Sequence, residues 1–237
     1  MPNQHFQFKQ FTIHQDQCAM KVGTDGVLLG AWVDCQFAQR ILDIGTGTGL
    51  LALMLAQRSE ANIDGIDIDE PAVLQAKENI QNSKWANRIH ISHSSFQDFH
   101  KKQTVCYDLI VSNPPYFENS LKSPSEERTT ARHTDSLNPI EILIGSKKLL
   151  TTDGRLCIIL PLDEGLQFIA KAEEYGFYCQ QKTAVIPRIG AAVKRLLLCF
   201  GLEKTVCQES ELVIETDKRH SYSDEYKKLT EDYYLKL

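Results

Sequence analysis

The feature that most constrains the fold is a run of three glycines between a strand pattern and a helix pattern. Residues 40–44 (RILDI) are typical of a buried strand, and residues 50–56 (LLALMLA) are typical of a buried helix. Between them, Gly45, Gly47 and Gly49 allow a tight turn and the close approach of a ligand to the backbone. A strand, a glycine loop and a helix in this order begin a βαβ unit, so we predict a parallel sheet.

The alternation of strands and helices continues along the chain. Further strands are predicted at 63–68, 89–92, 106–112, 154–160, 177–186 and 194–202, and helices at 70–82, 138–150 and 162–175. Right-handed crossovers place helices on both faces of such a sheet. The last two strands are joined by a short turn, which indicates an antiparallel pair. We therefore predict an α/β fold with a mostly parallel seven-stranded sheet, helices on both faces and an antiparallel final strand.

Length and composition favour one soluble domain. The 237 residues are 42% apolar, and the net charge of −5 excludes a global basic field for nucleic acid. Seven cysteines without a Cys-x-x-Cys pair indicate free thiols, and we expect no metal site. The start of the chain lacks a signal pattern and no apolar run reaches 18 residues, so we expect a cytoplasmic protein without a membrane partner.

The glycine spacing limits the ligand. A dinucleotide fingerprint requires Gly-x-Gly-x-x-Gly and a Walker loop ends in Gly-Lys-Ser/Thr, but Gly49 is followed by Leu50. Asp67 comes 24 residues after Asp43, at the end of the second core strand, where a carboxylate can accept both ribose hydroxyls of an adenosine. An acidic residue at this point could instead cap the N-terminus of the following helix, and we assign that role to Asp69 rather than to Asp67. An adenosine without a pyrophosphate indicates S-adenosylmethionine, whose positive charges suit Asp43. Over residues 40–202 the chain resembles the class I, Rossmann-like S-adenosylmethionine-dependent methyltransferases.

The tetrapeptide Asn113-Pro114-Pro115-Tyr116 after the fourth core strand carries the candidate chemistry. The prolines fix the backbone and lack N–H donors, so the Asn113 side-chain oxygen and the Pro114 carbonyl can converge as acceptors for an exocyclic amine. Tyr116 and the adjacent Phe117 offer aromatic faces on which a planar base can stack. The motif resembles that of methyltransferases acting on adenine, guanine or glutamine amide nitrogens.

Flanking segments narrow the resemblance. Residues 19–32 (AMKVGTDGVLLGAW), 113–134 and 222–236 are similar to the bacterial tRNA1(Val) (adenine(37)-N6)-methyltransferase family, over nearly the whole chain. The resemblance implies methylation of adenine 37 in the anticodon loop of a valine tRNA, with S-adenosylmethionine as cofactor. It also implies a set of cofactor contacts. The methionine end of the cofactor would lie at Lys21, Gly23 and Thr24, and its ribose would bind Asp67. The cofactor would be lined by Asp43, Gly45, Gly47 and Asn113, and its adenine would lie at Ser95 and Phe96. Asp98 remains an alternative adenine contact.

RNA binding would require local cations, because the net charge is negative. Residues 175–202 contain no carboxylate and four cations, and the stretch 113–137 adds more. Arg132 and Arg195, with Phe117, are the preferred substrate-binding candidates, since cations position an RNA through its phosphates. We expect a monomer or weak dimer.

We predict one methyltransferase domain over residues 1–237. Residues 1–36 are expected to cap the cofactor, 37–202 to form the catalytic core, and 203–237 to form a helical tail that ends in a helix at 222–235. Three alternatives stay open: an rRNA-guanine or protein-glutamine methyltransferase with the same tetrapeptide chemistry, a nicotinamide-dependent oxidoreductase, and a non-catalytic RNA-binding module. The glycine spacing argues against the second, and the intact tetrapeptide argues against the third.

Overall fold

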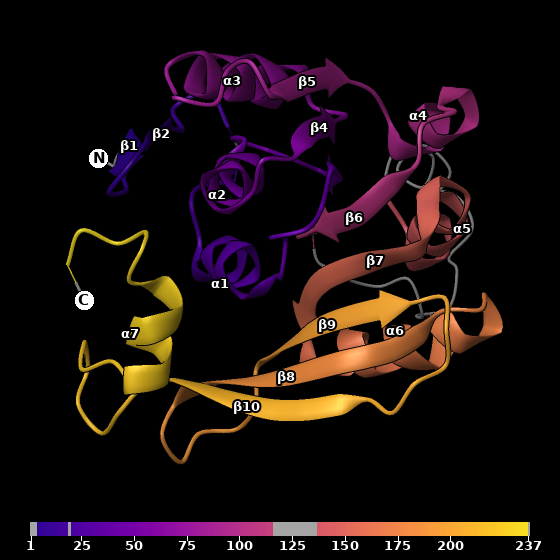
Figure 1. The fold of residues 1–237 in the computed structure, drawn as a ribbon. Coiled ribbons are helices and arrows are strands. Elements are labelled where there is room, and N and C mark those ends of the chain that lie inside the picture. The colour runs from indigo at the N-terminus through magenta and orange to yellow at the C-terminus, as the bar shows by residue number, and fades with distance from the viewer. Residues whose placement is uncertain (1–3, 19, 116–136, 237) are drawn as a thin grey trace, which may run out of the picture.

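The computed structural model describes residues 4–18, 20–115 and 137–236, in which helices cover both faces of one large sheet (Figure 1). A small hairpin precedes this sheet, and a short helix follows its last strand. In chain order the elements are β1 (His5–Gln7), β2 (Thr12–His14), α1 (Thr24–Trp32), β3 (Arg40–Ile44), α2 (Leu50–Arg58), β4 (Asn62–Asp67), α3 (Glu70–Gln81), β5 (Ile89–His93), α4 (Phe96–Lys102), β6 (Tyr107–Ser112), α5 (Pro139–Leu149), β7 (Leu150–Pro161), α6 (Leu162–Glu174), β8 (Tyr178–Arg188), β9 (Arg195–Gly201), β10 (Gln208–Glu215) and α7 (Asp224–Thr230).

The sheet has the order β10-β8-β9-β7-β6-β3-β4-β5. Strands β5, β4, β3, β6 and β7 are parallel, and β9 is antiparallel to both of its neighbours, β7 and β8. The glycine loop follows β3 and the tetrapeptide follows β6. Because these two strands are parallel neighbours, both segments begin at the same edge of the sheet. The mostly parallel sheet and its antiparallel final core strand are confirmed.

The sheet contains one strand more than the predicted seven. Strand β10 pairs in parallel with β8 at the edge of the sheet, so residues 203–237 do not form a purely helical tail. The helix expected over residues 222–235 is also shorter, since α7 ends at Thr230. Helix α4, between β5 and β6, is a further element that the sequence patterns did not predict.

Two apolar clusters separate the faces of the sheet. Helices α1, α2, α3 and α7 pack on one face around side chains such as Leu28 and Leu53, which are fully buried. Helices α4, α5 and α6 cover the other face, where Phe96 and Phe168 are buried. The prediction of helices on both faces is therefore confirmed. Burying both faces is what a parallel sheet requires, because its strands are apolar on both sides.

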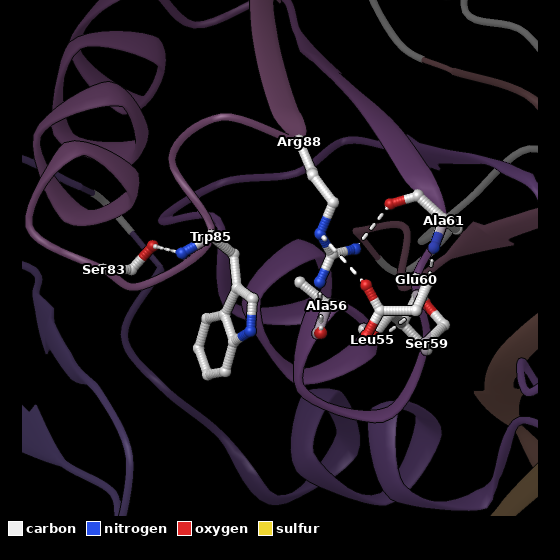
Figure 2. Close-up of polar contacts among 8 residues, drawn as sticks. All are labelled: Leu55, Ala56, Ser59, Glu60, Ala61, Ser83, Trp85 and Arg88. Atoms are coloured by element: carbon white, nitrogen blue, oxygen red, sulfur yellow. Dashed lines mark hydrogen bonds and ion pairs between the residues drawn. The ribbon is translucent and has the colours of Figure 1, made fainter.

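Arg88 secures the turn between α2 and β4 (Figure 2). Its guanidinium donates hydrogen bonds to the carbonyls of Ala61 (2.7 Å) and Ala56 (3.1 Å), and its Nε lies 3.9 Å from a Glu60 carboxylate oxygen. The carbonyls at the end of a helix lack partners within the helix, so the bond to Ala56 stabilises the end of α2, and the bond to Ala61 holds the turn that follows it. The ion pair itself contributes little, because Glu60 is exposed. Arg88 thereby links the end of α2 to the residue that precedes β4.

In residues 4–18, 20–115 and 137–236, no helix has the length and apolar character needed to cross a membrane. The same residues contain no group of three His, Cys, Asp or Glu side chains placed to hold a metal ion. The seven cysteines are free thiols.

Candidate active site

The glycine loop forms the floor of a cavity at the carboxyl edge of the sheet. Gly45, Gly47 and Gly49 have φ of 72°, 54° and 81°, in the left-handed region that favours glycine. The amides of Gly45 and Thr46 both donate to the Ile66 carbonyl at 2.9 Å, which ties the loop to β4. A Cβ on Gly45 or Gly47 would meet nothing within 4 Å, so the loop faces open space. These two glycines therefore present bare backbone to a ligand.

The cavity encloses about 300 Å³ and collects many of the predicted site residues. Its wall includes six of them, and these come from four separate segments: Gly45, Gly47, Asp67, Ser95, Phe96 and Asn113. The sequence patterns missed other parts of the wall. They are Cys18, Met20, Ile44, Ile66, Ile68, Asp69, Ala72, Ser94, Gln97 and Leu137, while Pro115 of the predicted tetrapeptide also lines the wall. Some of these, such as Ile68 beside Asp67, could have been found because they adjoin a predicted residue.

Asp67 is held by two backbone amides and keeps capacity for a ligand. Its Oδ2 accepts a hydrogen bond from the Gly47 amide at 2.8 Å, and its Oδ1 accepts from the Asp69 amide at 2.9 Å. An ionised carboxylate has about four lone-pair sites, so each oxygen can accept one more hydrogen bond. Asp69 precedes α3 at the N-cap position, as predicted, but its side chain makes no capping hydrogen bond.

Asp43 lies beneath the glycine loop rather than in the cavity wall. It is fully buried, and its Oδ2 accepts a hydrogen bond from the Thr46 hydroxyl at 2.6 Å. Burial raises the pKa of Asp43 to about 7, against the opposing effect of the Thr46 hydrogen bond. Asp43 therefore contacts the glycine loop through Thr46 and does not itself line the cavity.

The cofactor residues predicted in the N-terminal segment do not reach the wall, whereas their neighbours do. The Lys21 ammonium donates to the backbone carbonyls of Gln15 and Cys18, the latter at 3.0 Å. Gly23 is the N-cap of α1 and Thr24 begins that helix. These bonds fold the segment back on itself and bring Cys18 and Met20 to the cavity.

Asn113 stands where α1, the glycine loop and β6 meet. The Ser112 hydroxyl donates to the Ile44 carbonyl at 2.9 Å, which fixes the end of β6 beside the end of β3. A Cβ on Gly26 of α1 would lie 3.7 Å from the Asn113 Nδ2, so α1 covers the asparagine. Pro114 is buried and Pro115 is exposed at the cavity. The predicted partners Tyr116 and Phe117 lie outside the described residues.

Of the two arginines predicted to bind RNA, the structure describes only Arg195. Arg195 begins β9 on the side of the sheet where the parallel strands end. Its Nε lies 2.8 Å from a carboxylate oxygen of Asp25 in α1. Both side chains are about a quarter exposed. Arg132 lies outside the described residues.

Of the two adenine-contact alternatives, Ser95 is in the wall and caps α4 by accepting from the Asp98 amide at 3.1 Å, while Asp98 is exposed and outside the wall.

The strand order, the glycine cradle and the acidic end of β4 define a class I methyltransferase fold. The model of the methyltransferase small domain family matches residues 18–172. Among solved structures, a predicted O-methyltransferase from Agrobacterium tumefaciens superposes with a TM-score of 0.65 at 16% identity, over 88% of this chain and 96% of that one. The ribosomal protein L11 methylase from Lactobacillus delbrueckii superposes with a TM-score of 0.51 at 18% identity, over 76% and 77%. At such identities these structures show the fold alone.

The curated relatives identify the family within this class. The tRNA1(Val) (adenine(37)-N6)-methyltransferase of Bacteroides fragilis is 49% identical over all of both chains, and that of Trichodesmium erythraeum is 47% identical over the same share. The chain belongs to this family of methyltransferases. The resemblance stated from the sequence is thereby confirmed, as are the expectations of an enzyme and of S-adenosylmethionine as its cofactor.

Proposed function

We propose that the protein transfers the methyl group of S-adenosylmethionine to the exocyclic amino group of adenine 37 in the anticodon loop of tRNA1(Val). One observation carries the proposal: Asn113 lies in the wall of the same cavity as Gly45, Gly47 and Asp67. An amine held at the tetrapeptide is then close to a cofactor held at the glycine loop. The relatives from Bacteroides fragilis and Trichodesmium erythraeum carry this reaction and substrate in their names, which supports the choice of acceptor.

The residues present fit the cofactor. The exposed backbone of Gly45 and Gly47 gives room for close approach, Asp67 has lone pairs left for ribose hydroxyls, and apolar side chains such as Ile68 and Phe96 suit a purine ring. When bound, S-adenosylmethionine supplies an electrophilic methyl group. The buried carboxyl group of Asp43 under the loop favours a cationic ligand above it.

The tetrapeptide positions the acceptor. The Asn113 side-chain oxygen and the Pro114 carbonyl accept the two N–H groups of the adenine amine, which aims its lone pair at the methyl carbon. The amine is a poor nucleophile because its lone pair is delocalised, so alignment supplies much of the rate, with effective molarities of about 10⁵ M or more for well-oriented groups. The methylated nitrogen is cationic and releases one proton to water, so no strong base is required. Tyr116 and Phe117 stack on the base, and Arg132 and Arg195 contact the RNA.

The whole chain acts as one domain in this proposal. Residues 1–36 cap the cofactor, and Cys18 and Met20 in the cavity wall support that role. Residues 37–202 form the catalytic core, and residues 203–237 extend it. Lys21, Gly23 and Thr24 act by shaping the cap near the methionine end of the cofactor. A tRNA substrate places the activity in the cytoplasm, with the protein a monomer or weak dimer.

The test is methyl transfer to total tRNA with labelled cofactor, followed by mapping of the labelled nucleoside. Asn113→Ala should lower the rate by about 10²-fold or more, because misplacement of an aligned group by about 1 Å costs that much. Asn113→Asp keeps an acceptor oxygen and should retain part of the activity. The control Asn62→Ala removes an exposed asparagine at the opposite edge of the sheet and should be neutral.

Calorimetric titration with S-adenosylmethionine should give affinities within a few-fold of one another for all these proteins, because Asn113 is only one of several cofactor contacts and Gly45, Gly47 and Asp67 are unchanged. Label in rRNA or in a protein glutamine, or full turnover by Asn113→Ala, would contradict the proposal.

A further inference from the structure

Strand β10, which the sequence patterns did not predict, is followed by a polar turn. This turn lies at the carboxyl ends of the parallel strands, where the glycine loop and the tetrapeptide also begin. β10 runs parallel to β8, with Glu215 opposite Arg188, and both strands run in the same direction as β6. The segments that follow β6, β8 and β10 therefore begin at one edge. Figure 1 shows the orange loop after β8 and the yellow loop after β10 at the same end of their strands. The Ile189 amide donates to the Glu215 carbonyl at 2.9 Å, which joins these two loops.

The turn after β10 has a defined conformation. The Thr216 amide donates to the Ser221 carbonyl at 2.7 Å, and the Ser221 amide donates to the Lys218 carbonyl at 3.1 Å. The Glu215 carboxylate accepts from the His220 amide at 3.0 Å, where His220 has a φ of 64°. These bonds close the turn through its backbone, so the side chains of residues 217–220 are directed by a fixed frame and remain exposed.

Within the described parts of the chain, the cations on the two loops have no acidic partners. Arg188, Lys194, Lys218 and Arg219 are exposed, and none of them forms an ion pair with another described residue. Lys182, farther along β8, is by contrast neutralised by Glu209 at 2.9 Å. Residues 187–195 contain no carboxylate, whereas the turn over residues 215–222 contains two, Glu215, which accepts from the His220 amide, and Asp217. Among the described residues, four exposed cations without acidic partners therefore lie on two joined loops of a chain whose net charge is −5.

We propose that these four residues, Arg188, Lys194, Lys218 and Arg219, form a basic edge that binds the phosphate backbone of the tRNA away from the methylated base. This inference rests on the proposed function. β10 is four strand positions from β6, which at about 4.8 Å per strand is roughly 19 Å. That distance spans several stacked nucleotides, so the basic edge contacts flanking backbone while Asn113 contacts the target base. Such contacts position an RNA without reading its sequence.

The test compares two double variants that each remove two exposed cations. Lys218→Ala with Arg219→Ala changes the basic edge, and Lys101→Ala with Lys102→Ala changes the end of α4, near the opposite edge of the sheet. Binding of the unmodified tRNA is measured at several salt concentrations. The basic-edge variant should bind about tenfold more weakly at low salt, and its slope of log affinity against log salt should fall by about two. The control should retain the affinity and slope of the wild type.

Kinetics separate this inference from the proposed function. The basic-edge variant should show a raised KM for tRNA with kcat and cofactor affinity unchanged, because it alters neither Asn113 nor the cavity. The basic edge is overturned if the basic-edge variant keeps the affinity and salt slope of the wild type, or if both double variants lose affinity equally. In either case the wild type would still methylate tRNA. A wild type that methylates no tRNA would instead overturn the proposed function. Thermal unfolding confirms that both variants are folded.

Discussion

At the scale of single residues, buried polar groups organise the site. Gly45, Gly47 and Asp67 could be predicted because they follow strands of one parallel sheet, and such strand ends meet at one edge. Cys18 and Met20 could not, because their place depends on hydrogen bonds between distant segments. Asn79 illustrates the difficulty, since a polar residue in a helix pattern suggests exposure but Asn79 is only 1% exposed. Its side chain bonds backbone atoms that are remote in sequence.

Asp43 should give the ligand-free protein a pH-dependent stability. Burial raises its pKa from 3.8 to about 7, so between these values the folded chain holds a proton that the unfolded chain lacks. The contribution of Asp43 to stability is therefore full below about pH 4 and is lost as pH rises to about 7. At about 1.4 kcal/mol per pKa unit, this loss amounts to a few kcal/mol at most.

The measurement is urea unfolding of the wild type and of Asp43→Asn across this range. An asparagine cannot ionise, so the stability of the wild type relative to the variant should fall from pH 4 to pH 7 and level off above that. A constant difference between the two proteins would show that Asp43 does not titrate in this interval.

At the scale of elements, local patterns found the core strands but not their edge partner. The sequence of β10, QESELVIE, alternates only in part, and Leu212 is its one buried side chain. Its partner β8 lies well before it in the sequence, so no local signal shows the pairing. Helix α4 was missed because only Phe96 of its seven residues is buried, which leaves almost no helical periodicity.

The packing of α5 against α4 should control the shape of the cavity. A Cβ on Gly145 of α5 would lie 2.5 Å from Cε1 and 2.6 Å from Cζ of Phe96, which is itself a wall residue. Gly145→Ala should therefore push the Phe96 ring toward the cavity, weaken cofactor binding several-fold and lower stability by about 1–3 kcal/mol, as overpacking does.

The control for this prediction is Gly165→Ala in α6, where a Cβ would meet Leu196 at 3.0 Å. It crowds the same face of the sheet at a residue outside the cavity wall. Calorimetric titration with the cofactor and urea unfolding measure both effects. The prediction fails if Gly145→Ala binds the cofactor as tightly as Gly165→Ala does.

At the scale of the whole molecule, both ends of the chain pack near α2 and α3. The Lys9 amide donates to the Tyr233 carbonyl at 2.8 Å, and the Tyr233 hydroxyl donates to the Met54 carbonyl at 3.1 Å. Phe8 stacks on Tyr234 with ring centroids 6.0 Å apart. The tail thus holds the hairpin β1–β2 from one side. The hairpin leads directly into the segment that carries Cys18 and Met20, so contacts between the first and last parts of the sequence support one part of the cavity wall.

Asn79 holds the same segment from the other side. Its Nδ2 donates to the carbonyls of His14 and Thr48 at 2.8 and 2.9 Å, and its Oδ1 accepts from the His14 amide at 2.8 Å. One side chain of α3 therefore joins the N-terminal segment to the glycine loop. Asn79→Asp replaces the two donors with an oxygen facing two carbonyls, and each buried carbonyl left without a partner costs about 1–3 kcal/mol.

We expect Asn79→Asp to weaken cofactor binding and to expose the first 20 residues to proteolysis, since both the glycine loop and the capping segment lose an anchor. Titration with S-adenosylmethionine and mass analysis of limited digests measure these effects. The matched control is Asn82→Asp, the same change at an exposed residue directly after the same helix. If Asn79→Asp lowers only the unfolding free energy and leaves cofactor affinity equal to that of the control, then Asn79 stabilises the fold without positioning the site. Reduced affinity together with N-terminal cleavage would show that the cap closes the cavity through this residue.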